Sequence, residues 1–258
     1  MNTWESKNYD FANILFSGNC NAQCPYCIGQ QLGILYPSNL DTFPLKNFDA
    51  FLNLIQEHSI PEVIFTGTTT DPLLYRHQDK LLDIFEWELP DVRRAIHTNW
   101  LLIMKKLDIF NRYTKCTLSL PSFRQEIFEI MMGTRQAVPD IQAISVNTDI
   151  TIKVSRIVDM TNDFSEETEH FLETLASTKV TRVAFRKLAW DMSSWESTIQ
   201  QLEKLWAIHL WDYRNNPIYE IGNIEITLWS FDSSDSQSIN LFSNGHISRE
   251  YLLRKSEK

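Results

Sequence analysis

Three cysteines, Cys20, Cys24 and Cys27, stand close together in the run CNAQCPYC, directly after the apolar stretch 11–16. Gaps of three and two residues let the thiolates of one short loop face a common centre, which is the arrangement that an iron–sulfur cluster requires. Three ligands leave one iron without a protein ligand, and such an iron can bind and reduce a small molecule, whereas a pure electron carrier usually has four cysteines. We therefore interpret the run as the site of an iron–sulfur cluster.

A zinc site is the main alternative for these cysteines, because His58, His77 or His97 could supply a fourth ligand. Zinc prefers closed four-coordinate sites, commonly built from two CxxC knuckles, and the chain has no second CxxC. A disulfide framework is not expected in a chain of 258 residues with four cysteines and no secretory leader. The remaining cysteine, Cys116, is interpreted as a small buried residue of a strand.

The composition is that of an ordinary globular protein, with 43% hydrophobic and 22% charged residues. The apolar runs are too short to span a membrane, and the first residues lack the basic and apolar parts of a signal peptide, so we expect a cytoplasmic protein without a membrane partner. The net charge of −9 disfavours nucleic acid as a partner, because phosphate contacts require a dense array of Lys and Arg.

Short apolar runs alternate with longer amphipathic ones, which indicates repeated strand–helix units around a parallel sheet. We expect six strands, at 11–16, 62–66, 92–97, 115–120, 150–157 and 181–187. We expect helices near 45–58, 77–87, 101–111, 123–131, 165–177 and 194–211.

The end of the chain has a different character, because 224–229 and 238–242 resemble strands and Asn244-Gly245 predicts a hairpin turn. We therefore expect a core at 1–212 and a small β-rich appendage at 213–258 that closes one side or the bottom of the core.

Two further features accompany the cysteines: Tyr26 directly precedes the third cysteine, and Gly67-Thr-Thr-Thr-Asp-Pro72 follows the second strand. Together they resemble the motifs of the radical S-adenosylmethionine (radical SAM) superfamily, although the usual form of the second motif is Gly-Gly-Glu-Pro. The resemblance covers about residues 8–212 and implies an α/β fold, a partial (β/α)6 barrel with the C-terminal β appendage. It also implies two cofactors, a [4Fe-4S] cluster on the three cysteines and SAM, whose amino and carboxyl groups chelate the open iron.

In parallel α/β barrels the chemistry collects where the strands end, and the motifs follow that rule. The resemblance implies cofactor-binding residues in the motif loops and strands: Tyr26, Gly67, Thr68, Thr69, Thr70, Asp71, Asn99, Ser119, Ser155 and Arg156. Ordinary strand polarity is the alternative for the last three. Trp100 stands where the family pattern Thr-Asn-Gly has its glycine, so its ring is expected near the barrel mouth or packed beneath it.

Residues near the ends of the fifth and sixth strands are candidates for contact with the substrate. They are Arg186, Asn162 and Trp190. Arg186 also stands with Arg182 and Lys187 in one strand-like segment that could hold a phosphate or a carboxylate. Solvated strand faces are the better interpretation for Arg182 and Lys187.

The resemblance implies that a reduced cluster donates one electron to SAM, which is cleaved to methionine and a 5′-deoxyadenosyl radical that abstracts hydrogen from a substrate. An electron donor such as flavodoxin or ferredoxin is then required. No catalytic residue of the second half-reaction is assigned. We expect a small-molecule or nucleoside-like substrate, because the chain is compact and has no recognisable peptide-binding or auxiliary-cluster domain.

Other functions stay open at this stage. A peptide substrate is the second option, since the β tail could offer an edge for strand addition. Activation of a glycyl-radical enzyme is a third, although the glycine-rich leader expected before the cysteine loop is missing. The alternative from another class is a non-catalytic iron–sulfur redox or scaffold protein, which the altered Gly-Thr-Thr-Thr-Asp segment favours.

Overall fold

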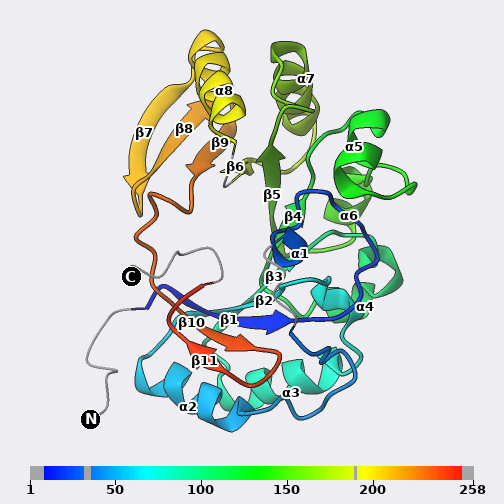
Figure 1. Ribbon diagram of the computed structural model, residues 1–258, viewed down its shortest axis with the longest axis vertical. Coiled ribbons are helices and arrows are strands. Elements are labelled where there is room, and N and C mark those ends of the chain that lie inside the picture. The colour runs from blue at the N-terminus through cyan, green and yellow to red at the C-terminus, as the bar shows by residue number, and fades with distance from the viewer. Residues whose placement is uncertain (1–8, 32–35, 189–190, 252–258) are drawn as a thin grey trace.

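The computed structural model describes residues 9–31, 36–188 and 191–251 (Figure 1). Six strands pair in parallel in the order of the chain. They are β1 Phe11–Phe16, β2 Glu62–Gly67, β3 Arg93–Thr98, β4 Lys115–Ser119, β5 Thr151–Val158 and β6 Arg182–Lys187. All six predicted strands are thereby confirmed to within one residue at each end.

The longer helices connect these strands and confirm most of the predicted ones. They are α2 Phe48–Glu57, α3 Gln78–Glu88, α5 Gln125–Met132, α7 Ser165–Ala176 and α8 Met192–Lys204. Shorter helical segments are α1 Ile28–Gln31, η1 Pro72–Leu74, η2 Ile103–Lys105, α4 Leu107–Phe110 and α6 Ile141–Val146. None of the described helices is long and apolar enough to cross a membrane.

Two predicted helices were wrong in their extent. The segment 101–111 is split into η2 and α4, because Lys106 leaves the helical conformation and its ammonium donates to the carbonyl of Leu73. The helix predicted to reach residue 211 ends at Lys204, and the run Ile208–Tyr213 forms strand β7 instead. Its Ile, Trp and Tyr residues favour a strand, and Trp206 turns the chain with a positive φ of 60°.

The C-terminal strands extend both edges of the six-stranded core. In Figure 1 the orange strands β8 Asn216–Ile221 and β9 Ile224–Trp229 continue the sheet beyond β6, whereas the red strands β10 Ser238–Phe242 and β11 Ile247–Ser248 lie beside the blue β1. The described strands form one open sheet in the order β11-β10-β1-β2-β3-β4-β5-β6-β9-β8-β7. The appendage is confirmed, but it covers two edges rather than one side or the bottom, because β9 pairs with β6 and β10 with β1.

The two faces of the sheet differ in polarity, as the period of two residues in a strand requires. One face packs against the helices and carries buried side chains such as Ile14, Phe65, Leu118, Val154 and Phe185. Cys116 belongs to this face and is buried, as predicted. The other face is polar, with Asn13, Thr66, His97, Thr117, Lys153 and Arg186 bordering a cavity. The apolar core therefore lies between sheet and helices and leaves the opposite face for chemistry.

Candidate functional site

A cavity of about 480 Å³ runs along the polar face of the sheet. Most of the residues predicted for the site line it, although they come from segments far apart in the sequence. These are Cys20, Cys24, Cys27, Tyr26, Gly67, Thr68, Thr69, Thr70, Asp71, Asn99, Ser119, Ser155 and Arg186. Trp190 lies outside the described residues.

The cysteine loop brings three half-buried thiols to one end of this cavity. Burial raises the pKa of Cys24 to about 12, and the nearby charges of Cys20 and Cys27 add to this effect. Burial likewise raises the pKa of Cys20. Three neighbouring thiolates are therefore disfavoured unless positive charge stands between them, which a bound metal centre supplies.

The arrangement of the thiols does not match a site for a single metal ion such as zinc. Among the described residues, no three His, Cys, Asp or Glu side chains lie close enough together to hold a single metal ion. Zinc needs all its ligands at about 2.0–2.3 Å from one point. A cluster with several irons offers a separate iron to each cysteine, so its ligands stand further apart.

The threonines of the second motif tie the cysteine loop to the end of β2. Thr68 donates its hydroxyl to the carbonyl of Phe16 at 3.0 Å, and Thr70 donates to the carbonyl of Asn19 at 2.9 Å. The Thr69 hydroxyl lies 3.2 Å from both the N–H and the carbonyl of Gly18. These hydroxyls are thus engaged by the backbone that leads into Cys20, and they position the loop.

Two positions near the cysteines require glycine, one in the second motif and one in α1. A Cβ at Gly67 would lie 1.7 Å from the carbonyl oxygen of Thr70, and one at Gly29 of α1 would lie 2.0 Å from the carbonyl oxygen of Thr68. Both backbones approach so closely that any side chain would force them apart.

Asp71 joins the loops that follow β2 and β3. Its carboxylate accepts hydrogen bonds from the Leu73 N–H at 2.9 Å, the Thr98 hydroxyl at 2.7 Å and the Asn99 N–H at 2.6 Å. Burial raises the pKa of Asp71, and these hydrogen bonds oppose that effect. The side chain lines the cavity, and its hydrogen bond to the Asn99 N–H joins it to the loop after β3.

Asn99, whose N–H is bonded to Asp71, directs its side chain toward the cysteine loop. Its Nδ2 donates to Asn21 Oδ1 at 2.7 Å and lies 3.7 Å from the sulfur of Cys20. A hydrogen bond to a thiolate sulfur stabilises its charged form. The neighbouring Trp100 keeps the left-handed backbone that suits glycine, with a φ of 66°, and its ring packs on Phe128 at 5.9 Å between centroids.

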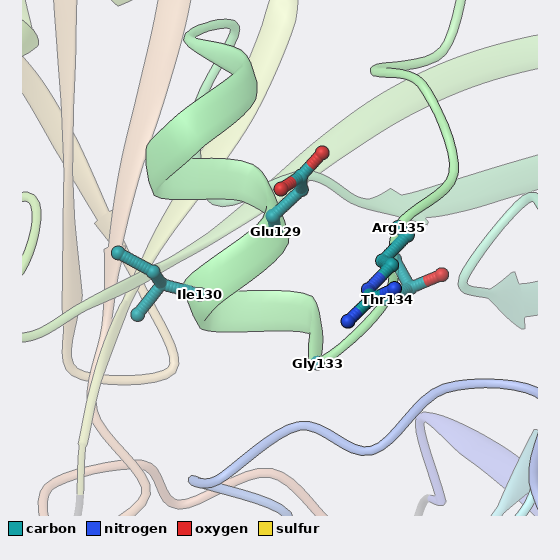
Figure 2. Close-up of a pocket in the computed structure, with 5 residues that line it drawn as sticks. All are labelled: Glu129, Ile130, Gly133, Thr134 and Arg135. Carbon is teal, nitrogen blue, oxygen red and sulfur yellow. The ribbon is translucent and has the colours of Figure 1, made fainter.

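The end of α5 supports the other side of the cysteine loop. The Gln23 N–H donates to the carbonyl of Met132 at 3.1 Å, and the Tyr26 hydroxyl donates to the Met132 sulfur at 3.3 Å. Gly133 ends the helix with a φ of 57°, and a Cβ there would lie 2.1 Å from the carbonyl oxygen of Gln23. Figure 2 shows Gly133 at this turn, where the chain leaves the helix toward Thr134. The five residues drawn there line a cavity of about 340 Å³, which shares no lining residue with the larger one.

Two predicted ligands lie away from the cavity. Arg156 is fully buried and donates to the carbonyls of Pro121 and Asn162, at 3.2 and 2.6 Å, and to the Thr168 hydroxyl at 3.2 Å. The Asn162 amide donates to the carbonyls of Pro121 and Ile157. Neither residue is in the lining of the cavity, because Arg156 projects from the face of β5 that packs against the helices.

Ser119 and Ser155 do face the cavity and stand opposite each other in the pairing of β4 with β5. Sequence reasoning missed several other lining residues, namely Lys153, Met132, Trp229, Phe231 and Tyr251. Lys153 was detectable, because it shares its strand face with Ser155. The others depend on how the appendage and α5 reach the core.

Comparison with known proteins connects this geometry to a fold. No family model and no curated protein matches the sequence. SuiB of Streptococcus suis bound to S-adenosylmethionine superposes with a TM-score of 0.68 and 15% identity over 97% of this chain and 62% of its own. SuiB bound to its precursor peptide SuiA gives a TM-score of 0.62 and 14% identity over 96% of this chain and 63% of its own.

A radical SAM methyltransferase from Sphaerobacter thermophilus gives a TM-score of 0.59 and 13% identity over 93% of this chain and 70% of its own. The chain thus spans less than two thirds of the length of SuiB. The protein has the fold of the radical SAM enzymes.

Proposed function

We propose that the protein is a radical SAM enzyme whose [4Fe-4S] cluster is held by Cys20, Cys24 and Cys27. The observation that carries the proposal is that these thiols and the second motif open onto one cavity in this fold. When bound, the reduced cluster would supply the electron that cleaves SAM, and the resulting 5′-deoxyadenosyl radical would take a hydrogen atom from the substrate.

The residues of the chain would then orient both cofactors. Asn99 would stabilise the Cys20 thiolate through the contact of its amide with the sulfur. Ser119 and Ser155 would bind SAM, since both line the cavity and neither hydroxyl makes a hydrogen bond to another described residue. Asp71, Thr68 and Thr70 would keep the loops in place by the hydrogen bonds described above.

The electron would come from a separate protein such as flavodoxin or ferredoxin. Cys116, the cysteine outside the loop, is buried on the helix-facing side of the sheet, so it cannot carry electrons from a donor to the cluster. A donor would therefore have to approach the half-buried cysteine loop itself.

A small molecule is the substrate that the cavity favours. A volume of about 480 Å³ falls in the range of small-molecule sites, which is roughly 300–1,000 Å³. We propose that this substrate and SAM share the cavity, with the substrate on the side of β5, β6 and β9.

One observation favours a peptide as the second candidate substrate. Strand β7 is an edge of the sheet and all six of its residues are exposed, so its free backbone could pair with an extended peptide. The neighbour SuiB was crystallised with a precursor peptide.

Electron paramagnetic resonance on the anaerobically reconstituted, reduced protein tests the proposal. We expect a cluster signal that changes when SAM is added and that is lost in Cys24→Ala. Cys116→Ala is the matched control, because it removes a buried thiol outside the cavity, and it should keep both the signal and its response. A cluster signal that SAM does not alter would instead support the redox or scaffold protein.

A further inference from the structure

The cavity wall formed by β5, β6 and β9 holds N–H donors for which the described residues supply no acceptor. The Arg186 guanidinium makes no hydrogen bond and no ion pair within the described part of the chain, and its Nε is buried. Its Cζ lies 6.0 Å from the centroid of the Phe231 ring. Trp229 Nε1 is also buried and has no hydrogen-bond partner among residues 9–31, 36–188 and 191–251. Such donors are costly to bury unless a ligand completes them.

The strand register places these groups next to each other. Arg186 of β6 stands directly opposite Trp229 of β9, so both side chains project from the same face. Lys153 of β5 reaches this region from the adjacent strand and donates to the Thr227 hydroxyl at 3.2 Å. Thr227 precedes Trp229 by two residues and therefore shares its face.

The two cations of this wall, Arg186 and Lys153, differ from Lys115 and Lys187 of the same cavity, which pair with carboxylates. Lys115 pairs with Glu62 at 2.6 Å, and Lys187 pairs with Asp232 at 2.5 Å. Among the described residues, Lys153 has only the neutral hydroxyl of Thr227 as a direct partner. The region thus has an excess of positive charge inside a protein whose overall charge is −9.

The cations also act on each other. Burial lowers the pKa of Lys153 to about 8, and the charge of Arg186 is the next largest cause. Burial and then Arg186 lower the pKa of His97, which lines the same cavity. An anion placed among these groups would reduce the repulsion between the cations and would accept hydrogen bonds from the unpaired N–H groups.

We propose that Arg186, Lys153 and Trp229 form a subsite that binds a carboxylate or phosphate group of the substrate. This inference rests on the proposed function, since it assigns a substrate class to the same cavity. The stacked rings of Phe231 and Tyr251, 5.9 Å apart between centroids, border the subsite and would pack against an apolar or planar part of that substrate. The substrate is therefore a small organic acid or phosphate ester.

Calorimetric titration of the full-length protein with inorganic sulfate and with succinate tests this assignment. We expect saturable binding at one site that Arg186→Gln and Lys153→Met each weaken roughly tenfold, because each removes a charged hydrogen-bond donor. Trp229→Phe keeps the ring, loses only the N–H and should weaken binding severalfold. Arg182→Gln is the matched control: it removes the same charge from the same strand at an exposed site paired with Glu225, and it should leave affinity within about twofold.

The carboxylate of SAM is the other source of the same chemistry, and SAM titration of the reconstituted protein separates the two. If Arg186→Gln weakens SAM binding tenfold and leaves succinate binding unchanged, or if the wild type binds neither anion saturably, the inference is overturned. Anion binding with the expected variant effects but no response of the cluster to SAM would overturn the proposed function alone. Cleavage of SAM without any anion site would overturn the inference alone.

Discussion

Lys153 and Arg156 illustrate how one strand separates a structural charge from a functional one. They are three residues apart in β5 and therefore project from opposite faces of the sheet. Arg156 is enclosed by hydrogen-bond acceptors and by the rings of Phe171 and Phe185, at 4.8 and 5.0 Å. Lys153 instead faces the cavity with one neutral partner. The first charge stabilises the fold, and the second is available to a ligand.

Replacing Arg156 by Met should lower the free energy of unfolding by about 3 kcal/mol, because it leaves buried carbonyl acceptors unpaired and removes one of the two cations near the fully buried Glu167, which keeps only Arg124 among the described residues. Urea unfolding measures this change. Arg182→Met, at an exposed position, should cost less than about 0.5 kcal/mol. Equal costs for the two variants would show that the Arg156 cluster does not stabilise the fold as described.

The lowered pKa of Lys153 predicts a pH dependence of stability. Its pKa falls from an ordinary 10.5 to about 8 through burial and the charges of Arg186, Arg182 and Lys115, which Glu225 opposes. Below about pH 8 Lys153 keeps its proton in both the folded and the unfolded protein, so the folded protein bears the full cost of the buried charge. Between about pH 8 and 10.5 Lys153 loses this proton in the folded protein and keeps it in the unfolded one, so the free energy of unfolding should rise by about 2–3 kcal/mol.

Urea unfolding at pH 7 and pH 10, in the wild type and in Lys153→Met, isolates this contribution. Methionine has similar length and no charge, so the difference between wild type and variant should shrink toward high pH. A difference that is the same at both pH values would contradict the assignment.

Strand periodicity explains what the sequence could predict at the level of residues. Ser155 and Arg156 are adjacent in β5, so only one of them can face the cavity, and the period of two residues would have selected Ser155 together with Lys153. The cysteines and Gly67 were predictable because their spacing is local. Arg156 and Asn162 could not be assigned to their buried cluster, since it depends on α7 and on the loop at Pro121.

Among the elements, α5 contacts the cysteine loop through its C-terminal end. Its last residue, Met132, accepts from Gln23 and Tyr26, and Gly133 lets the two backbones meet. The sequence predicted this helix but not its contact with the loop, because 108 residues separate Met132 from Cys24. The sequence did indicate where the helix ends, because Gly133 follows Met132 and a glycine commonly ends a helix.

Gly133→Ala should reduce the iron and sulfide bound after reconstitution, because its Cβ would push the Gln23 carbonyl out of place. Gly222→Ala is the matched control. Its φ of 60° is similar to the 57° of Gly133, so both variants carry a strain of about 1–2 kcal/mol, but nothing lies within 4 Å of its added Cβ. If both variants bind as much cluster as the wild type, α5 does not position the loop.

At the scale of the whole molecule, the C-terminal segment completes the sheet at two distant places. Asn13 of β1 donates to Asn240 of β10 at 2.7 Å, across 227 positions of sequence. The segment was predicted to contain strands from local patterns such as Asn244-Gly245, whereas its partners could not be predicted because parallel pairing leaves no local turn signal. The predicted division at 212/213 falls within β7.

This topology predicts that core and appendage unfold together. Hydrogen exchange at increasing urea concentration should release the amides of β9 and β10 with those of β6 and β1, because each pair shares a hydrogen-bonded ladder. Loss of protection in β9 and β10 while β1 and β6 remain protected would support two independent domains.

The central claim is that the cysteine loop and the cavity together cleave SAM. The most direct test is mass-spectrometric detection of 5′-deoxyadenosine after anaerobic reconstitution with iron and sulfide and reduction with dithionite in the presence of SAM. We predict that the wild type and Cys116→Ala form it, and that Cys20→Ala, Cys24→Ala and Cys27→Ala do not. A fully reconstituted wild type that binds SAM but forms no 5′-deoxyadenosine, even with a panel of small acids and phosphate esters added, would contradict the account.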